Sequence, residues 1–392
     1  MQTSSCSSRK LKIAMIGHKR VPSREGGVEI VVEELSSRMV QKGHSVTLYN
    51  RGGHHVSGEE YDGDEVEYYR GIHIKKSWTI DVKGLAAVTS SFFASIAAAF
   101  GPYDVVHYHA EGPCLPCFIP KLFGKKVIAT IHGLDHQRAK WGKIASAVIM
   151  AGERSAVKHA DEIIVLSEGV KNYFKDRYHR DVKVIPNGVV KTEKTDADVI
   201  CLKWGLQKDE YILFLGRVVP EKGVHYLIDA YRRLNTDKKL VIAGGASDTN
   251  DYLDRIYHQA EAIISENGDY YVSTDRKIVF TGFVQGEVLA ELYSNAYLYV
   301  LPSDLEGMPL SLLEAMSYGN CCLTSDIPEC ADVIGTQGVT FKKGDVDDLA
   351  DKLEELIKDE TRTGLIGSLS ADYICDRFNW DDVTDRTLEL YE

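Results

Sequence analysis

Short apolar runs alternate with helical segments along this chain, and that alternation limits the folds open to it. Residues 11–17 form a continuous apolar run, and 28–39 carry valine, leucine and methionine at helical spacing. Gly43 ends that segment, and 44–50 read as a second strand. An apolar run on each side of a helix predicts a βαβ unit, whose parallel strands are buried on both faces.

The same rhythm continues through the chain and restarts after a polar stretch at 191–198. We expect strands at 104–109, 126–132, 162–166, 183–185, 211–215, 240–243, 278–280 and 297–301. Residues 51–83 alternate less clearly and predict two irregular strands. Helices are expected at 224–234, 252–264, 349–358, 362–374 and 381–391.

Two such series predict an α/β protein with two doubly wound, Rossmann-like domains that face each other across a cleft. We expect the first domain at 1–187 and the second at 188–376. The last segment, 377–392, is predicted to be a helix that crosses back to the first domain. In sheets of this kind, ligands bind beyond the carboxyl ends of the strands.

Charge is distributed unevenly between the two halves of the chain. Residues 1–186 hold 26 Lys and Arg against 20 Asp and Glu, whereas 187–392 hold 20 against 38. A basic half could face phosphates or an anionic membrane surface, so peripheral membrane contact stays open. Nucleic acid is disfavoured, because no compact Lys/Arg run is interleaved with aromatic residues.

Several features bear on location in the cell. The 8 cysteines are scattered without framework spacing, which favours a reducing cytoplasm. The first ten residues lack an apolar core and predict a loose tail rather than a targeting signal. Residues 84–100 are rich in Ala and Ser and predict a buried or half-buried helix, with an interfacial membrane helix as the alternative.

The stretch from Tyr299 to Thr324 predicts strand, loop, helix and strand in succession. Glu306 and Glu314 bracket the loop and the first helical turn. Pro309 suits the first helical position, where its fixed φ and missing N–H carry no penalty. A helix N-terminus after a glycine-containing loop can bind an anionic ligand, and the two carboxylates could accept hydrogen bonds from hydroxyl groups of that ligand. The alternative is a solvated helix face.

Two more loops could meet a phosphate. Gly17 to Gly27 joins the first strand to the first helix, and Gly26 and Gly27 would let a ligand approach the backbone. A nicotinamide dinucleotide is disfavoured there, because the GxGxxG pattern is absent and Asn50 ends the second strand. The loop 216–223, GRVVPEKG, offers a guanidinium and an ammonium to a diphosphate. Ordinary turns remain the alternative for both loops.

Three histidines stand at predicted strand ends, namely His107, His109 and His132. Histidine there could hold a hydroxyl or a phosphate, or transfer a proton. Zinc is disfavoured, because no third ligand accompanies His107 and His109. The pair Cys114 and Cys117 has no second CxxC and does not indicate a metal or redox site.

Taken together, these stretches resemble one family, the retaining nucleotide-sugar glycosyltransferases of the GT-B fold known as family 4. Glu306 and Glu314 match its E-x7-E signature. The other matching segments, in the family's order, are 25–35, 105–109, 130–133, 165–170, 185–189, 215–231, 241–245, 280–284 and 306–316. Residues 132–143 resemble a bacterial subgroup assigned to surface-polysaccharide or rhamnose transfer.

The resemblance implies roles at matching positions. Lys222 and Arg217 would hold the donor diphosphate, Glu314 the ribose, and Glu306 the sugar and the charge at its anomeric carbon. The implied catalytic residues are Arg217, Lys222, Glu306 and His132. The implied donor contacts are Gly26, Gly27, Arg217, Lys222, Val284, Glu306, Met308, Pro309, Leu310 and Glu314, and the implied acceptor side is His109, His132 and Asp135. No cofactor and no essential metal are expected.

The resemblance further implies an enzyme that moves a hexosyl or deoxyhexosyl group from a nucleotide sugar, such as a UDP-sugar, to an acceptor hydroxyl. The acceptor would be a glycan or a lipid-linked or protein-linked saccharide, in polysaccharide or glycoconjugate synthesis. Because the first domain offers no clear carboxylate nucleophile, we expect the sugar to be transferred by front-face displacement. Three alternatives stay open, namely a nucleotide-sugar epimerase of the same fold, a glucan polymerase and a nucleotide-sugar-binding protein without turnover.

Overall fold

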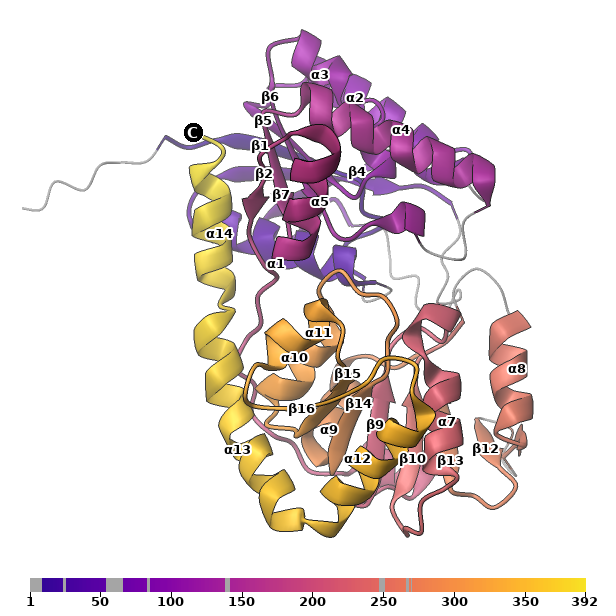
Figure 1. Cartoon of the computed structure of the whole chain (residues 1–392). Helices are drawn as coiled ribbons and strands as arrows, with labels where there is room; N and C mark the ends of the chain where they lie inside the picture. Colours follow the sequence, from indigo (N-terminus) through magenta and orange to yellow (C-terminus); the bar gives the residue numbers. More distant parts are fainter. Residues whose placement is uncertain are drawn as a thin grey trace, which may run out of the picture. The chain divides into compact units, whose positions relative to one another are not determined.

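The structure is a computed structural model that describes residues 9–23, 26–53, 66–82, 85–137, 142–246, 251–265, 268 and 270–392. The chain divides into two compact units (Figure 1). The first comprises 1–186 together with 380–392, and the second comprises 187–379. Each unit is a mainly parallel sheet with helices on its faces, so the predicted class of two doubly wound α/β domains is confirmed.

The first unit holds a sheet in the order β3-β4-β2-β1-β5-β6-β7-β8. All neighbouring strands pair in parallel except β3, which is antiparallel to β4. The strands are β1 (Lys12–Ile16), β2 (Ser45–Arg51), β3 (Tyr68–Tyr69), β4 (Ile72–Ser77), β5 (Val105–His109), β6 (Lys126–Ile131), β7 (Glu162–Val165) and β8 (Lys183–Val184).

Helices of the first unit come from both ends of the chain. They are α1 (Gly27–Gln41), α2 (Ala86–Phe100), α3 (Phe118–Leu122), α4 (Lys143–His159), α5 (Glu168–Tyr178) and α14 (Trp380–Glu389). Helix α14 packs on α1, where Nε of Arg38 lies 3.2 Å from Oδ1 of Asp381. Arg386 of α14 also donates a hydrogen bond to the carbonyl of Val184.

The second unit holds a sheet in the order β11-β12-β13-β10-β9-β14-β15-β16. Its strands are β9 (Tyr211–Leu215), β10 (Lys239–Ala243), β11 (Ala262–Ile264), β12 (Tyr271–Ser273), β13 (Ile278–Gly282), β14 (Leu298–Leu301), β15 (Cys322–Ser325) and β16 (Val339–Phe341). Its helices are α6 (Val199–Trp204), α7 (Val224–Tyr231), α8 (Asp251–Gln259), α9 (Gly286–Asn295), α10 (Leu310–Ser317), α11 (Pro328–Ile334), α12 (Val346–Lys358) and α13 (Glu360–Arg377).

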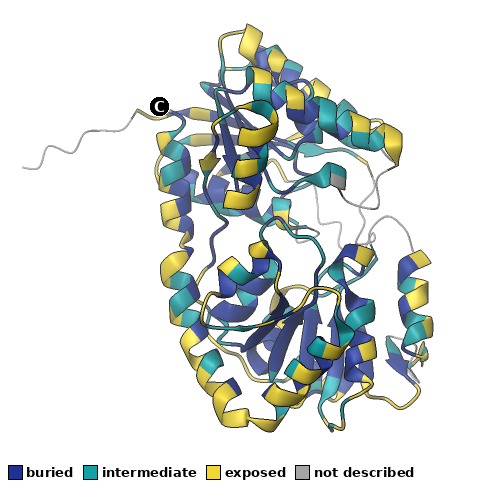
Figure 2. Ribbon diagram, in the orientation of Figure 1, coloured by how far each residue is buried: buried dark blue, intermediate teal, exposed yellow. Residues whose placement is uncertain are grey.

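Strand order identifies where each sheet would bind a ligand. In the second unit the chain builds outward from β9 through β10 to β13, then returns to place β14 on the other side of β9. That reversal puts a crevice beyond the carboxyl ends of β9 and β14. The corresponding position in the first unit lies beyond β1 and β5. Strands β5 and β14 are buried at every residue, as central parallel strands should be (Figure 2).

The structure corrects one predicted helix. Residues 252–264 were expected to be continuous helix, but α8 ends at Gln259 and 262–264 form β11. Glu261 adopts a φ of 50°, which a right-handed helix cannot include. Strand β11 then pairs antiparallel with β12. Between 51 and 83 the structure has β3 and β4, whereas 54–65, and likewise 1–8 of the predicted tail, lie outside the described residues.

Helix α2 is half buried, as the composition of 84–100 predicts. Its alanine and serine face packs inward, with Ser91, Ala94 and Ser95 buried. The phenylalanines point outward, and Phe92, Phe93 and Phe100 are exposed. None of the helices formed by the described residues has the length and apolar character needed to span a bilayer.

Candidate active site

Two loops meet beyond β9 and β14 in the second unit. The first carries Gly216 and Arg217 and ends in a turn of 3₁₀ helix at Pro220–Lys222, and the second follows β14 from Pro302 onward. Gly223 follows with a φ of 67°, and a Cβ there would lie 2.0 Å from the carbonyl oxygen of Pro302. Only glycine allows this approach. The Asp304 N–H also donates to the carbonyl of Glu221 at 2.8 Å, so the two loops are held together.

A nearly buried ion pair joins these loops. The Nζ of Lys222 lies 2.5 Å from Oε1 of Glu306, and their side chains are 13% and 8% exposed. Ser303 donates to the same carboxylate oxygen at 2.6 Å. Ser325 in turn donates to the carbonyl of Ser303. The geometry therefore brings together the ammonium and the carboxylate that the sequence singled out, 84 residues apart.

Helix α10 begins one residue later than predicted. Pro309 is its N-cap rather than its first residue, because its ψ of 106° is extended. The Pro309 carbonyl accepts from the N–H groups of Leu312 and Leu313. Glu314 lies in the second turn, where the Tyr293 hydroxyl donates to its Oε2 at 3.1 Å. Ahead of Leu312, the N–H groups of Leu310 and Ser311 are the ones that a helix leaves without internal acceptors and that an anion can bind.

Three more of the predicted donor contacts, Met308, Val284 and Arg217, lie on loops of the same unit, whereas Gly26 and Gly27 belong to the first unit. Met308 is fixed by Asn187, whose side-chain amide donates to the Met308 carbonyl at 3.3 Å. Val284 follows β13 and packs against the core of the second unit. Arg217 comes two residues after the end of β9 and five residues before Lys222.

Sequence reasoning missed Glu221 and Ser303. Glu221 is 8% exposed, and its two carboxylate oxygens accept no hydrogen bond from any described residue. Its place beside Lys222 in the Pro-Glu-Lys-Gly turn was the available signal. Ser303 gave no signal, because a lone serine after a strand is typical of any turn.

In the first unit, His109 and His132 meet at the ends of β5 and β6. The Nδ1 of His109 lies 3.1 Å from Nε2 of His132, and the two rings are stacked with their centroids 5.3 Å apart. Burial lowers the pKa of His109 well below its usual range, so its imidazole is neutral. Its Nε2 is buried and has no hydrogen-bond partner in the described ranges.

The structure shows that His107 has a structural role rather than a place at the predicted site. It lies within β5, not at its end. Its Nδ1 is 2.6 Å from the Tyr391 hydroxyl, and its Nε2 is 2.7 Å from Oγ1 of Thr130. Burial lowers its pKa to about 3. With both ring nitrogens satisfied, His107 has no capacity to bind a substrate.

The described parts of the loop beyond β1 contact neighbouring residues of the first unit. Gly26 caps α1, which begins at Gly27. A Cβ on Gly26 would lie 2.6 Å from Oε2 of the buried Glu29. A dinucleotide site would carry an acidic residue at position 50. Here Oδ1 of Asn50 accepts from the Val21 N–H, and its Nδ2 donates to the Val21 carbonyl. Glu25, the start of the matching segment 25–35, lies outside the described residues.

Asp135 opens a short 3₁₀ turn, Asp135–Gln137, next to two buried carboxyl groups. Its N–H donates to Oε2 of Glu111 at 2.8 Å. Burial, with the adjacent Glu153, raises the pKa of Glu111 above its usual range. Among the described residues, Glu111, His136 and Glu153 form a group whose ligand atoms are close enough for a metal. It lies in the first unit, whereas Lys222 and Glu306 lie in the second.

A buried histidine in this unit gives a pH dependence. Burial lowers the pKa of His18 from 6.5 to about 4, despite its hydrogen bond to Asn50. A depressed pKa stabilises the fold above pH 6.5, and that contribution is lost as the pH falls toward 4. When the pH is lowered from 7 to 4, we expect the unfolding free energy of His18→Gln to fall by about 3 kcal/mol less than that of the unmodified chain.

Urea unfolding at successive pH values measures this difference. Glutamine preserves a donor to Asn50, so the variant isolates the titration. His179→Asn, which alters an exposed imidazole, is the control. Equal acid sensitivity of His18→Gln and the unmodified chain would contradict the prediction.

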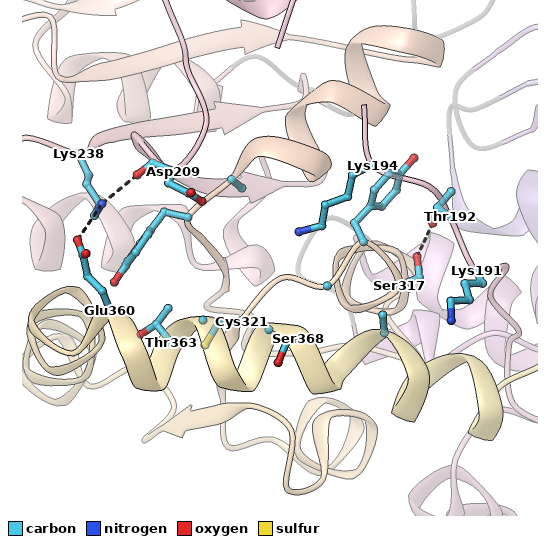
Figure 3. Close-up of a pocket in the computed structure, with 17 residues that line it drawn as sticks. Lys191, Thr192, Lys194, Asp209, Lys238, Ser317, Cys321, Glu360, Thr363 and Ser368 are labelled. Atoms are coloured by element: carbon cyan, nitrogen blue, oxygen red, sulfur yellow. Dashed lines mark hydrogen bonds and ion pairs between the residues drawn. The ribbon is translucent and has the colours of Figure 1, made fainter. Parts of the chain in front are cut away.

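One cavity of the second unit lies away from the predicted donor contacts Arg217, Lys222, Glu306 and Glu314. It has a volume of about 520 Å³ and is bordered by Lys191, Lys194, Lys238, Tyr297 and Glu360, among others (Figure 3). Lys238 and Tyr297 directly precede β10 and β14, and Glu360 begins α13, so the cavity is at the amino ends of these two strands. Lys238 is already engaged there by Asp209 and Glu360. Because none of Arg217, Lys222, Glu306 and Glu314 lines it, this cavity is not the candidate site.

Two mainly parallel sheets, each covered by helices, define the fold of this chain as GT-B. Solved structures share this fold, including sucrose-phosphate synthase from Thermosynechococcus elongatus, with a TM-score of 0.77 at 20% identity over 97% of this chain and 98% of that one. Anabaena HepE in complex with UDP and glucose is similar, with a TM-score of 0.76 at 18% identity over 97% and 98%.

Sequence comparison identifies the family. The model for glycosyl transferases group 1 matches residues 202–368, and that for glycosyltransferase family 4 matches 25–193. An uncharacterized glycosyltransferase of Methanocaldococcus jannaschii is 26% identical over 97% of this chain and 98% of its own. Alpha-maltose-1-phosphate synthase of Mycolicibacterium smegmatis is 26% identical over 73% and 78%. The chain belongs to the group 1 glycosyltransferases of the GT-B fold, as its motifs predicted.

Proposed function

We propose that this glycosyltransferase moves a sugar from a nucleoside diphosphate donor to an acceptor hydroxyl with retention of the anomeric configuration. The observation that carries the proposal is the nearly buried pair of Lys222 and Glu306 at the strand-order reversal of the second unit. A pair in this position offers a cation to a leaving diphosphate and a carboxylate to the sugar.

The chemistry sets the roles of the two groups. Glycosyl transfer breaks the bond between the anomeric carbon and the diphosphate oxygen, so positive charge grows on the sugar and negative charge on the phosphate. Lys222, Arg217 and the N-terminus of α10 would stabilise the departing diphosphate. Both hydrogen bonds to Glu306 within the described structure fall on Oε1, which leaves Oε2 for a sugar hydroxyl or the developing cation.

Retention follows in this proposal from displacement on one face. The leaving phosphate oxygen takes the proton of the acceptor hydroxyl as the new bond forms on the side from which the diphosphate departs. Glu314 would bind the ribose, and the backbone near Met308, Pro309 and Leu310 would contact the phosphates. His109, His132 and Asp135 would serve the acceptor. No metal is needed at the diphosphate, because fixed cations and a helix terminus supply the positive charge.

UDP is the donor nucleotide that we test first, because HepE binds UDP and glucose in a structure of the same fold. The acceptor we propose is a growing surface polysaccharide or glycoconjugate. A similar segment in the serotype-specific mannosyltransferase WbdA of Escherichia coli, 33% identical over 39% of this chain, supports that choice. Transfer would then take place on the cytoplasmic side of the membrane.

Incubation with nucleotide sugars, with and without acceptors, tests the proposal. We expect release of nucleoside diphosphate that depends on acceptor, and an NMR coupling constant at the new anomeric centre that matches the donor's. Interconversion of the sugar without acceptor would instead indicate the epimerase. Extension of a glucan primer would indicate a polymerase, and binding without turnover a non-catalytic protein.

We further propose that the first unit contacts a membrane surface through α2 and its surroundings. Trp78 and Phe93 have ring centroids 4.7 Å apart, and Phe100 and Phe123 lie at 4.6 Å, all four exposed. Exposed aromatic clusters beside basic residues are typical of interfacial binding. The excess of basic side chains in residues 1–186 favours an anionic surface.

Co-sedimentation with vesicles measures this contact. Joint replacement of Phe92 and Phe93 by serine is expected to weaken binding to anionic vesicles at least about tenfold, because each ring loses apolar burial. Leu365→Ser, an exposed apolar residue of the second unit, is the control. Binding that is unchanged by the double substitution, by salt and by lipid charge would refute the contact.

A further inference from the structure

Three side chains from separate segments of the first unit converge in its interior. Glu111 follows β5, His136 lies in the 3₁₀ turn Asp135–Gln137, and Glu153 belongs to α4. Their ligand atoms lie within 4.8 Å of one another. Both carboxylate side chains are 0% exposed, and the imidazole is 13% exposed.

Each of the three residues presents one buried atom that has no hydrogen-bond partner in the described parts of the chain. These atoms are Oε1 of Glu111, Nδ1 of His136 and Oε2 of Glu153. Unsatisfied buried carboxylate oxygens are costly, and native structures rarely leave them without a proton, a donor or a cation. Here two such oxygens face one imidazole nitrogen.

The other carboxylate oxygens are occupied, which fixes the two groups in place. Oε2 of Glu111 accepts from the Asp135 N–H at 2.8 Å. Oε1 of Glu153 accepts from the hydroxyl of Tyr173 at 3.0 Å and from that of Tyr178. Outer hydrogen bonds of this kind orient metal ligands in proteins.

The separations suit an ion better than direct hydrogen bonds. Nδ1 of His136 is 3.4 Å from Oε1 of Glu111 and 3.6 Å from Oε2 of Glu153. Charge-assisted hydrogen bonds would be about 2.7–2.9 Å. Ligands at about 2.0–2.2 Å from a tetrahedral zinc ion lie about 3.4 Å from each other.

A glycine lets α4 approach Glu111. A Cβ on Gly152 would lie 2.2 Å from the carbonyl oxygen of Glu111, so any other residue there would push the helix away. Gly152 directly precedes Glu153, and this close packing sets the depth at which its carboxylate enters the cluster.

We propose that Glu111, His136 and Glu153 bind one divalent transition-metal ion of the zinc class. One nitrogen and two carboxylate oxygens form a ligand set that zinc accepts, with water in the fourth position. The ion would join β5, the 135–137 turn and α4, and so hold the segment that follows His132. It would lie in the first unit and take no part in neutralising the donor diphosphate, which the second unit serves.

The test uses the full chain, stripped with a chelator and titrated with Co²⁺ and then Zn²⁺. We expect one ion per chain by elemental analysis, and the visible absorption of tetrahedral cobalt without a thiolate charge-transfer band. A thiolate band would assign the metal to cysteine and overturn the proposal, as would failure to bind either ion.

Variants then locate the ion. His136→Ala and Glu153→Gln are expected to weaken zinc binding by about 100-fold or more, since loss of an outer partner alone costs about 10- to 100-fold. His159→Ala removes another imidazole of α4 and should bind zinc normally. Circular dichroism checks that each variant is folded, and the cobalt titration of the unmodified chain stands independently of them. Equal zinc affinity in all three variants would overturn the assignment.

Discussion

Replacement of Lys222 by alanine is expected to lower kcat by about 10²- to 10³-fold, the effect of losing one preorganised donor to a developing negative charge. The ammonium is held by Glu306 at 2.5 Å in a nearly buried position, so it is already oriented before a donor arrives. Binding of nucleoside diphosphate should weaken as well, because the same group meets the ground-state charge. Arg217→Ala is expected to act in the same direction, by about 3 kcal/mol.

Initial rates and diphosphate affinity, measured on the same preparations, check this prediction. Lys208→Ala removes an exposed lysine from the same unit and should leave both quantities unchanged. A Lys222→Ala enzyme with a normal kcat would remove Lys222 from the catalytic residues.

Replacement of Glu306 by glutamine is expected to separate turnover from diphosphate binding. The variant keeps the shape of the side chain and an oxygen for the Ser303 hydroxyl, but it loses the negative charge. We expect kcat to fall by about 10²- to 10³-fold, since the positive charge at the anomeric carbon loses its partner. Diphosphate should bind at least as tightly as before, because Lys222 is no longer partly neutralised.

This opposite effect on binding distinguishes Glu306 from Lys222. Calorimetric titration with nucleoside diphosphate, beside initial rates, measures both quantities. Glu287→Gln, an exposed acid on α9, is the matched control. Weaker diphosphate binding with normal kcat would show that Glu306 serves the phosphates and not the sugar.

The sequence predicted most of the strands, because buried parallel strands are continuous apolar runs between helical periods. Tyr211–Leu215 and Leu298–Leu301 are examples that match the expected ranges closely. The helix predicted at 252–264 was too long, since its apolar residues fit a helix and an edge strand equally well. Glu261, whose left-handed φ separates the two, has no glycine-like signal in the sequence.

The candidate site was predictable where residue chemistry is distinctive and not where distant contacts decide. Lys222 and Glu306 stood out as a cation and a carboxylate after strands, and they meet. His107 looked equivalent to His109, but its partner Tyr391 lies 284 residues away. Glu111 and Glu153 are separated by 42 positions and carried no spacing signal.

The central claim is that the loops beyond β9 and β14 bind a nucleoside diphosphate through Lys222. Thermal unfolding across a panel of nucleoside diphosphates and their sugars tests it most directly, because a ligand of the native state raises the midpoint. We predict that at least one diphosphate, UDP first among them, raises the midpoint of the unmodified chain and that Lys222→Ala loses the shift. No shift with any diphosphate, or an equal shift in Lys222→Ala, would contradict the claim.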